Sequence, residues 1–511
     1  MKTSLIFAAA LCLLPGAQAC AGQPVSLKLD KKSLVLLDRT GAPRASLPMR
    51  AEQLDSRPGI AVVLDAATQH ARLFRVDLDA LTLAPLAPLP VQAFGVESLC
   101  LFRDRQGLDF LFVAGKDGQA EQWLLHGDTA RLVRKLSLPP ESGQCRVDDA
   151  AHALYVDEAG VGTWAYEADS EAVPARTLLK RGQRAKAVAA TQVAVVQPVV
   201  QTEPVARMGD VADDPAIWVH PSDPSRSRVL GTNKKQGLLV YDMQGRQTQF
   251  LESGRLNNVD LRQGVQLGGA AFDLAVATQR DDNTVVLYGI NADGVLAELA
   301  RFATGLPEVY GICLYRPREG GLDVIVNDKS GTFRQYRIGR SGAQWSGTLA
   351  REFKVASQPE GCVADDRNGR LFVGEEKRGV WTLAAQADQA ARLTLVLGVG
   401  KHLRPDVEGM AIYHGAQAAY LVVSSQGDNS YVVLDAGAPY KVRGRFKVGF
   451  NAAAGIDGTA ETDGLDVTAN NLGPAFPQGM LVIQDGYKRL PDGTQNFKYV
   501  SWEDVARALK L

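Results

Sequence analysis

The second half of the chain carries short turns in which carboxylates and basic side chains stand beside glycine. Hard cations bind clustered carboxylate oxygens, and phosphate groups bind lysine and arginine. Turns of both kinds at many strand ends could therefore build one site for a metal-bridged phosphate ester. The turns are Asp213-Asp214, Asn233-Lys234-Lys235-Gln236-Gly237, Gln279-Arg280, Asn327-Asp328-Lys329-Ser330-Gly331, Glu360-Gly361, Glu375-Glu376, Asp406-Val407-Glu408-Gly409, Gln426-Gly427-Asp428, Asp457-Gly458 and Gln484-Asp485-Gly486.

Each of these motifs alone has an ordinary structural explanation. Asp213-Asp214 is typical of a solvated turn, Lys234-Lys235 of surface charge, and Arg280 of an ion pair. Asp406 and Glu408 are more informative, because alternate residues of an extended segment share one face. Only the joint occurrence of the motifs favours a site for metal and phosphate.

Other routes to phosphate ester hydrolysis lack their residues. None of the six histidines stands in an Arg-His-Gly motif, and no cysteine is followed six positions later by arginine. The chain has no Gly-x-Ser-x-Gly elbow and no histidine or cysteine spacing typical of zinc. A nucleophilic side chain is therefore not expected.

The elements between the turns are short apolar runs bounded by Gly, Asn and Asp, which indicates strands. Convincing amphipathic helices are scarce, and residues 502–511 are one candidate. Many short strands with recurring turns favour a β-propeller, in which only short sheet edges remain. In the second half the glycine-flanked motifs recur about every 40 to 50 residues, a spacing typical of propeller blades. We expect an all-β protein.

The first half repeats the pattern of the second. Cys100-Leu101-Phe102 and Cys145-Arg146-Val147-Asp148-Asp149 parallel Cys313-Leu314-Tyr315 and Cys362-Val363-Ala364-Asp365-Asp366. This long-range duplication predicts two equivalent disulfides, Cys100–Cys145 and Cys313–Cys362. Four buried thiols are the alternative.

Composition and the N-terminus limit the environment. The 511 residues have a formal net charge of −1, which argues against a general nucleic-acid or membrane-surface binder. Residues 1–19 have the pattern of a secretory signal: Lys2, an apolar stretch and an Ala-x-Ala cleavage site. We expect an exported monomer, periplasmic or extracellular, without a membrane span. Cys20 could carry a lipid, although Ala17 and Gln18 fit a lipoprotein signal poorly.

The second half, about residues 203–511, resembles the β-propeller phytases, also called alkaline phytases. The resemblance rests on the order and density of its motifs. They are Asp213-Asp214-Pro215-Ala216-Ile217-Trp218, Thr232-Asn233-Lys234-Lys235, Gly254-Arg255-Leu256-Asn257-Asn258-Val259-Asp260, Glu308-Val309-Tyr310-Gly311, Pro359-Glu360-Gly361, Gly374-Glu375-Glu376, Asp406-Val407-Glu408-Gly409, Ser424-Ser425-Gln426-Gly427, Thr462-Asp463-Gly464-Leu465-Asp466, Gln484-Asp485-Gly486 and Asn496-Phe497-Lys498.

The resemblance implies a six-bladed propeller that binds several Ca²⁺ ions and hydrolyses phosphate from myo-inositol hexakisphosphate (phytate). It implies one phosphate pocket for cleavage and an adjoining one for affinity, with direct attack by a metal-bound water. The implied catalytic residues are Lys234, Arg280, Lys329 and Tyr310. The implied substrate contacts are Lys234, Lys235, Arg280 and Lys329. The implied calcium ligands are Asp213, Asp214, Tyr310, Glu360, Glu376, Asp406, Glu408, Gln426, Asp457 and Asp463. Asp210 and Asp485 could bind a structural calcium or help to close the domain.

The chain departs from the family pattern at two positions. Ser330 stands where relatives often have an acidic residue, which removes one potential calcium ligand. Gln201 stands where some relatives have glutamate.

We expect a signal peptide at 1–19, an incomplete propeller-like domain at 20–190, a linker at 191–204 and the catalytic propeller at 205–511. In the first copy, Lys31 and Lys116 correspond to Lys234 and Lys329, but Gly143 stands at the Glu360 position. Too few ligands remain there for an independent site. That domain would assist substrate capture or stabilise the catalytic half.

Two other functions stay open. A calcium propeller lactonase or esterase would use the carboxylates but not the three cationic side chains together. An exported propeller could instead bind a protein or a glycan, with calcium as a structural part.

Overall fold

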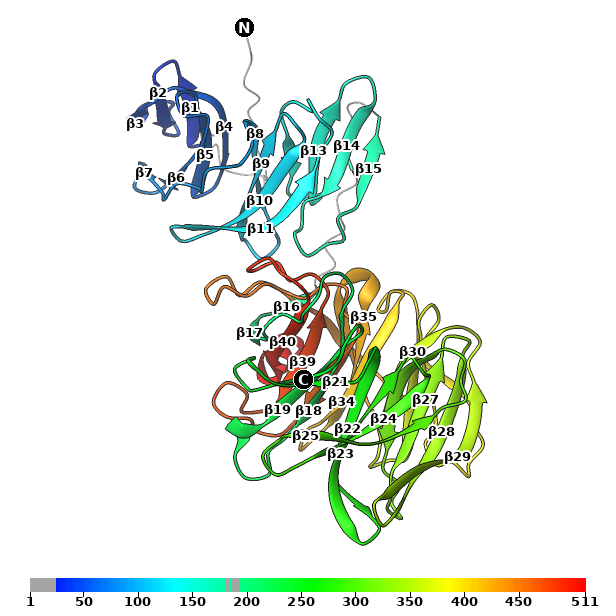
Figure 1. Cartoon of the computed structure of the whole chain (residues 1–511). Helices are drawn as coiled ribbons and strands as arrows, with labels where there is room; N and C mark the ends of the chain where they lie inside the picture. Colours follow the sequence, from blue (N-terminus) through cyan, green and yellow to red (C-terminus); the bar gives the residue numbers. More distant parts are fainter. Residues whose placement is uncertain (1–23, 181–182, 186–192) are drawn as a thin grey trace, which may run out of the picture. The chain divides into compact units, whose positions relative to one another are not determined.

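The computed structural model describes residues 24–180, 183–185 and 193–511. The expected signal peptide and Cys20 therefore lie outside the described residues. Contacts divide the chain into two compact units: unit 1, Met1–Ser170 and Pro174–Ala189, and unit 2, Glu171–Val173 and Ala190–Leu511. Figure 1 colours unit 1 from blue to teal and most of unit 2 from green to red.

Unit 1 contains four antiparallel sheets among its described residues. They are β1–β3 (Ser26–Asp30, Ser33–Leu37, Pro43–Pro48), β4–β7 (Ala51–Arg57, Ile60–Asp65, Ala71–Asp77, Thr82–Pro85), β8–β11 (Val96–Arg103, Asp109–Gly115, Gln119–His126, Thr129–Ser137) and β12–β15 (Arg146–Asp148, Ala153–Glu158, Gly162–Glu167, Arg176–Leu179).

The described residues of unit 2 form six sheets, each built on four consecutive strands or, in the last, on three. The first three are β18–β21 (Ala212–Trp218, Arg228–Asn233, Gly237–Tyr241, Gln247–Glu252), β22–β25 (Leu256–Leu267, Ala270–Gln279, Thr284–Ile290, Leu296–Ala303) and β26–β29 (Val309–Tyr315, Asp323–Asp328, Thr332–Ser341, Gln344–Lys354). The others are β30–β33 (Pro359–Asp365, Arg370–Glu375, Gly379–Ala384, Thr394–Gly398), β34–β37 (Val407–His414, Ala419–Ser425, Ser430–Asp435, Val442–Val448) and β38–β40 (Leu465–Thr468, Met480–Asp485, Asn496–Ser501).

The first strands of these sheets form a closed ring. Each of β18, β22, β26, β30 and β34 contacts the first strand of the next sheet, and β38 contacts β18. The apolar cores lie between neighbouring sheets: Val276 and Leu287 of one sheet pack with Val324 and Val326 of the next. Packing of this kind gives a propeller. The expected six-bladed fold is confirmed.

Two short strands before the propeller complete its last two sheets. β16 (Ala194–Val196) pairs in parallel with β37, and β17 (Pro198–Gln201) pairs antiparallel with β40. Within the expected linker at 191–204, Ala194–Val196 and Pro198–Gln201 are therefore strands, not free chain. Its Val and Gln residues cover two sheet edges, which would otherwise expose unpaired backbone groups.

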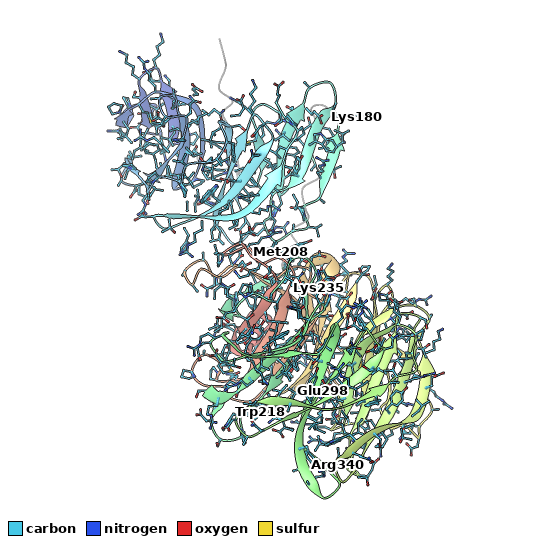
Figure 2. The ribbon with its side chains drawn as sticks, viewed as in Figure 1. Lys180, Met208, Trp218, Lys235, Glu298 and Arg340 are labelled. Carbon is cyan, nitrogen blue, oxygen red and sulfur yellow. A yellow bond between two sulfur atoms is a disulfide. The ribbon has the colours of Figure 1, made fainter. Side chains whose placement is uncertain are left out.

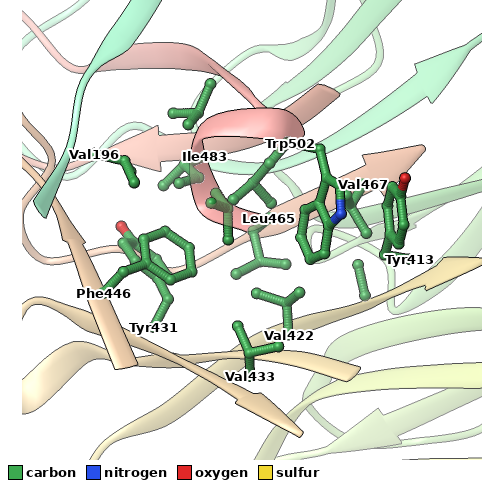
Figure 3. Close-up of a cluster of buried hydrophobic side chains, with 14 of the residues drawn as sticks. Val196, Tyr413, Val422, Tyr431, Val433, Phe446, Leu465, Val467, Ile483 and Trp502 are labelled. Carbon is green, nitrogen blue, oxygen red and sulfur yellow. The ribbon is translucent and has the colours of Figure 1, made fainter. Parts of the chain in front are cut away.

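The expected C-terminal helix forms as α1 (Trp502–Leu509). Its Trp502 stacks on Tyr413 with ring centroids 4.0 Å apart. Figure 3 shows this pair in the buried cluster that also includes Val196 of β16 and Phe446. The two ends of unit 2 therefore share one core. Two 3-10 helices, Pro224–Arg226 and Gln426–Asp428, complete the described elements.

Both expected disulfides form. Cys313 of β26 bonds to Cys362 of β30, and Cys100 of β8 bonds to Cys145, which precedes β12. Each bridge joins neighbouring sheets, so the duplicated sequence has a duplicated covalent link.

Candidate active site

The first strands of the six blades begin at one end of the propeller, and each brings a polar side chain there. These residues, called the inner ring below, lie at the start of a first strand or just before it. They are Asp213, Asn257, Tyr310, Glu360, Glu408 and Asp463. Residues far apart in sequence therefore meet because every blade repeats one construction.

A β-bulge lies at the start of five of these strands. Opposite β31, for example, pairing passes from Pro359 directly to Cys362, so that Glu360 and Gly361 together oppose one residue. The same irregularity occurs around Asp213, Asn257 and Tyr310, and at Glu408. Bulges interrupt the regular alternation of side chains and re-aim them, which is why they accompany active sites.

Glycine follows four inner-ring residues for a steric reason. A Cβ at Gly361 would lie 2.3 Å from the carbonyl oxygen of Glu408, and one at Gly311 would lie 2.0 Å from that of Glu360. Gly409 and Gly464 repeat this close approach. The recurring acid–glycine pairs in the sequence therefore let neighbouring strands approach each other at the ring.

A second set of side chains, the outer ring, lies at the ends of the second strands. The first two strands of each blade are antiparallel, so the second strand ends beside the point where the first strand begins. The outer ring therefore lies at the same end of the propeller as the inner ring. Cations stand on the first three blades, whereas the fourth and fifth carry an acid and an amide. The set is Lys234, Arg280, Lys329, Glu376 and Gln426. The site therefore has a cationic side and an acidic side.

The acidic side contains a cluster able to hold a metal ion. One carboxylate oxygen from each of Glu360, Glu376 and Glu408 lies within 4.8 Å of the others, and all three residues are buried. Both carboxylate oxygens of the buried Asp213 and one of Glu408 lack a hydrogen-bond partner. Buried carboxylates without partners are costly unless a cation neutralises them. These oxygens fit a hard cation such as Ca²⁺.

Burial and mutual repulsion favour the protonated forms of these acids. Burial raises the pKa of Asp213 well above its ordinary value, although Lys234 opposes the shift. Burial, reinforced by the Glu360 charge, likewise raises the pKa of Glu408. Burial raises the pKa of Glu376 and of Asp463 to about 7. The acidic side thus concentrates more negative charge than its own cations balance.

On the cationic side two basic groups flank one aromatic ring. The Lys329 ammonium lies 5.1 Å, and the Arg280 guanidinium carbon 5.7 Å, from the centroid of the Tyr310 ring. Both distances are within cation–π range. Burial, followed by the Glu360 charge, raises the pKa of Tyr310, so its hydroxyl stays protonated. Tyr310 therefore stands between the cations and the acids.

Asn257 links the two sides directly. Its amide nitrogen donates to Glu360 Oε1 at 3.1 Å, and its amide oxygen accepts from Arg280 at 3.2 Å. No role for this residue was inferred from its type. Its position in the inner ring, equivalent to that of Asp213, is the signal that could have indicated one.

Lys234 lies closer to the acids than the other two cations. Its ammonium lies 2.6 Å from Asp463 and 2.8 Å from Asp210, and Asp213 is 3.9 Å away. Burial alone would lower its pKa, but the charges of Asp213 and Asp463 raise it. Asp463 also accepts from the Gln426 amide at 2.7 Å. Lys234 therefore joins the first blade to the last.

Asp406 lies at the edge of the acidic side. Its charge acts on Glu376 and on Glu461, and its carbonyl accepts from the backbone N–H of Gln426. The Ser330 hydroxyl, at the position where relatives often have an acid, donates to Asp328 Oδ1 within its own turn at 2.7 Å.

Three of the predicted residues lie apart from the cluster. Asp214 lines a cavity of about 310 Å³ along the propeller axis together with Asp260 and Asp466. The Lys235 ammonium donates to the carbonyl of Met208 at 2.9 Å, and Figure 2 labels both residues. Asp457 pairs with Lys498 at 3.0 Å. Asp457, one of the expected calcium ligands, therefore already faces an ammonium.

Comparison with known proteins agrees with this geometry. The model of the Phytase family matches residues 172–510, and the chain belongs to that family. The 3-phytase of Bacillus subtilis (strain 168) is 41% identical over 325 residues, which cover 60% of this chain and 84% of that protein. The match begins just before the propeller, so the site described above lies wholly within it.

The described ranges hold no helix that is both long and apolar enough to cross a membrane.

Proposed function

We propose that the chain is a calcium-dependent phytase, which hydrolyses phosphate monoesters of myo-inositol hexakisphosphate. The observation that supports this most strongly is the division of one ring into a cationic and an acidic side. A highly charged phosphate ester needs both, because its negative charge must be neutralised before a nucleophile can approach.

Glu360, Glu376, Glu408 and Asp213 would hold the calcium ions, with Asp463, Asp406 and Gln426 beside them. Calcium bound there would neutralise phosphate charge and make a nearby water more acidic, so that no nucleophilic side chain is needed. Lys329 and Arg280 would bind the phosphate being cleaved and stabilise its oxygens as charge shifts. The Tyr310 ring would keep these two cations apart from the carboxylates.

Asn257 would fix the geometry between the two sides. It holds the Arg280 guanidinium and the Glu360 carboxylate in one orientation, which reduces the reorganisation required during the reaction. Lys234, which contacts acids of the first and last blades, would supply a third positive charge to a second phosphate group of the same substrate.

We further propose that the chain is divided into domains as its sequence predicts. Residues 205–511 form the catalytic domain, and residues 20–190 assist or stabilise it. The residue pattern at 1–19 supports export to the periplasm or medium.

A matched pair of lysine variants tests the assignment. Lys329→Ala should reduce phosphate release from phytate about 100-fold, since it removes one cation that contacts the reacting phosphate. Lys116→Ala, at the corresponding position of unit 1, should leave the rate unchanged. Equal rates for Lys329→Ala and the unaltered chain would contradict the proposed role.

A further inference from the structure

The last sheet of the propeller contains a lysine that solvent does not reach. Lys498 lies on β40, between β39 and β17, and its side chain is fully buried together with those of Asp457 and Asp485. Its ammonium lies 3.0 Å from Asp457 Oδ1 and 2.7 Å from Asp485 Oδ2. It also donates to Asn496 Oδ1 at 2.8 Å. An ammonium has three N–H groups, and three oxygens surround this one.

The remaining carboxylate oxygens of this pair have partners from the backbone. Asp485 Oδ1 accepts from Ala460 at 3.2 Å and from Tyr487 at 3.1 Å, and Asp457 Oδ2 accepts from the N–H of Arg489. Asp457 Oδ1 accepts no hydrogen bond, but it forms an ion pair with the Lys498 ammonium at 3.0 Å. Asp213 has no hydrogen-bond partner on either oxygen and lies 3.9 Å from the Lys234 ammonium. Acids that already face an ammonium at close range give a metal ion little to bind.

The elements that carry these three residues indicate what the cluster does. Asp457 comes from the loop after β37, Asp485 ends β39, and Lys498 pairs in register with Gln201 of β17. Lys498 thus links the loop after the fifth blade and the sixth blade through its side chain, and the strand that closes the ring through its backbone. Two carboxylates and an amide oxygen are also a ligand set that would suit Ca²⁺ if the ammonium were absent.

We propose that Lys498 permanently occupies the position of a structural cation, so that closure of this propeller requires no metal at Asp457 and Asp485. Pairing of β17, β39 and β40 is then independent of calcium. This inference does not depend on the reaction that the site performs.

Two variants of one residue test the proposal. Lys498→Ala leaves both carboxylates and opens space for an ion and water, whereas Lys498→Met removes the charge but fills the space. The measurements are the midpoint of thermal unfolding of the full chain in chelator and in calcium, and the calcium bound per chain by equilibrium dialysis. Both variants should unfold about 5–15 °C lower in chelator, because an unpaired buried charge is costly.

Calcium should restore much of the stability of Lys498→Ala, beyond any calcium-induced shift of the unaltered chain, and not that of Lys498→Met. Lys498→Ala should also bind one more ion than the unaltered chain.

The double variant Asp457→Asn with Lys498→Met, which removes opposite charges together, should bind as many ions as the unaltered chain. Fewer ions in the double variant would show that a metal belongs at Asp457. No additional ion in Lys498→Ala would show an ordinary ion pair. Either result would overturn the proposal.

Discussion

In both units one arginine joins three sheets through the same three contacts. In unit 2 Arg262 donates to Asp366 at 2.8 Å, to Asp260 at 2.9 Å and to the carbonyl of Leu314 at 2.7 Å. These contacts link the second, third and fourth blades near the propeller axis.

Arg57 repeats the arrangement in unit 1. It donates to Asp149 at 2.7 Å, to Asp55 at 3.0 Å and to the carbonyl of Leu101 at 2.7 Å. The disulfides correspond as well, with sequence separations of 45 and 49 residues. The duplication therefore retained the contacts that hold sheets together.

The units differ where the active site lies. Unit 1 keeps a bulge between Val96 and Ser98, but the bulged residue is the exposed Glu97 in place of Tyr310. Ser98 stands at the Gly311 position, and its hydroxyl accepts from the Cys145 backbone. Unit 1 therefore retains the bulge, but other side chains occupy the positions that form the site in unit 2. Fold and chemistry are thus separable in this architecture.

The largest effect should come from removing the acids of the inner ring. The double variant Glu360→Gln and Glu408→Gln should lose at least about 10³-fold in phosphate release, because it removes two ligands of the metal cluster. Glu97→Gln, which changes the exposed acid at the Tyr310 position of unit 1, should lose nothing. A colorimetric phosphate assay measures both. A double variant that keeps a tenth of the rate would contradict the assignment.

Replacing either arginine should lower the stability of the unit that contains it. Arg262→Ala should lower the stability of unit 2, and Arg57→Ala that of unit 1, each by about 3–5 kcal/mol, because partly buried acids lose their partner. Scanning calorimetry would follow the units as separate transitions. Arg57→Ala should also leave catalysis intact. A shift of one common transition by both variants would mean that the units do not unfold separately.

A partly buried acid should give unit 1 a pH dependence of its own. Burial raises the pKa of Asp104 to about 7, far above the ordinary value of 3.8. A raised pKa means that the folded state holds the proton more tightly, so this group costs stability as the pH rises from about 4 to 7.

Asp104→Asn should remove that slope and raise the unfolding free energy of unit 1 at pH 8 by roughly 2 kcal/mol. Asparagine can still accept the N–H of Leu108, which lies 2.8 Å from the Asp104 carboxylate. Chemical denaturation at pH 4.5 and pH 8 checks this. An equal change at both pH values would contradict the titration.

The smallest effect is expected from Asn257. Asn257→Ala should lower kcat about tenfold, which corresponds to about 1.4 kcal/mol, and leave KM nearly unchanged, since the residue orients groups and is not a ligand of the substrate. Steady-state kinetics on phytate separates the two constants. A rise in KM alone would indicate direct substrate contact instead.

The sequence allowed the strands and both disulfides to be predicted, because each is a local pattern that recurs along the chain. The family resemblance implied the six blades and pointed to every residue of the two rings except Asn257. Side-chain direction was not predictable. Asp213 and Asp214 are adjacent, yet one faces the ring and the other the axial cavity. Which face each takes depends on a bulge that forms only when neighbouring strands pack.

Lys498 illustrates the same limit. As a lysine within a strand it has the pattern of an exposed residue, and only the tertiary structure places two acids around it. Likewise, two segments of the expected linker, Ala194–Val196 and Pro198–Gln201, form strands because sheet edges in the last two blades were free to pair.

In the proposed reaction, divalent ions and cationic side chains act together at one end of a single propeller. The most direct test is phosphate release from phytate by the purified full chain, first treated with a chelator and then given back calcium in excess. Activity should fall to background and then return. Undiminished hydrolysis in chelator, or none after calcium is restored, would contradict it.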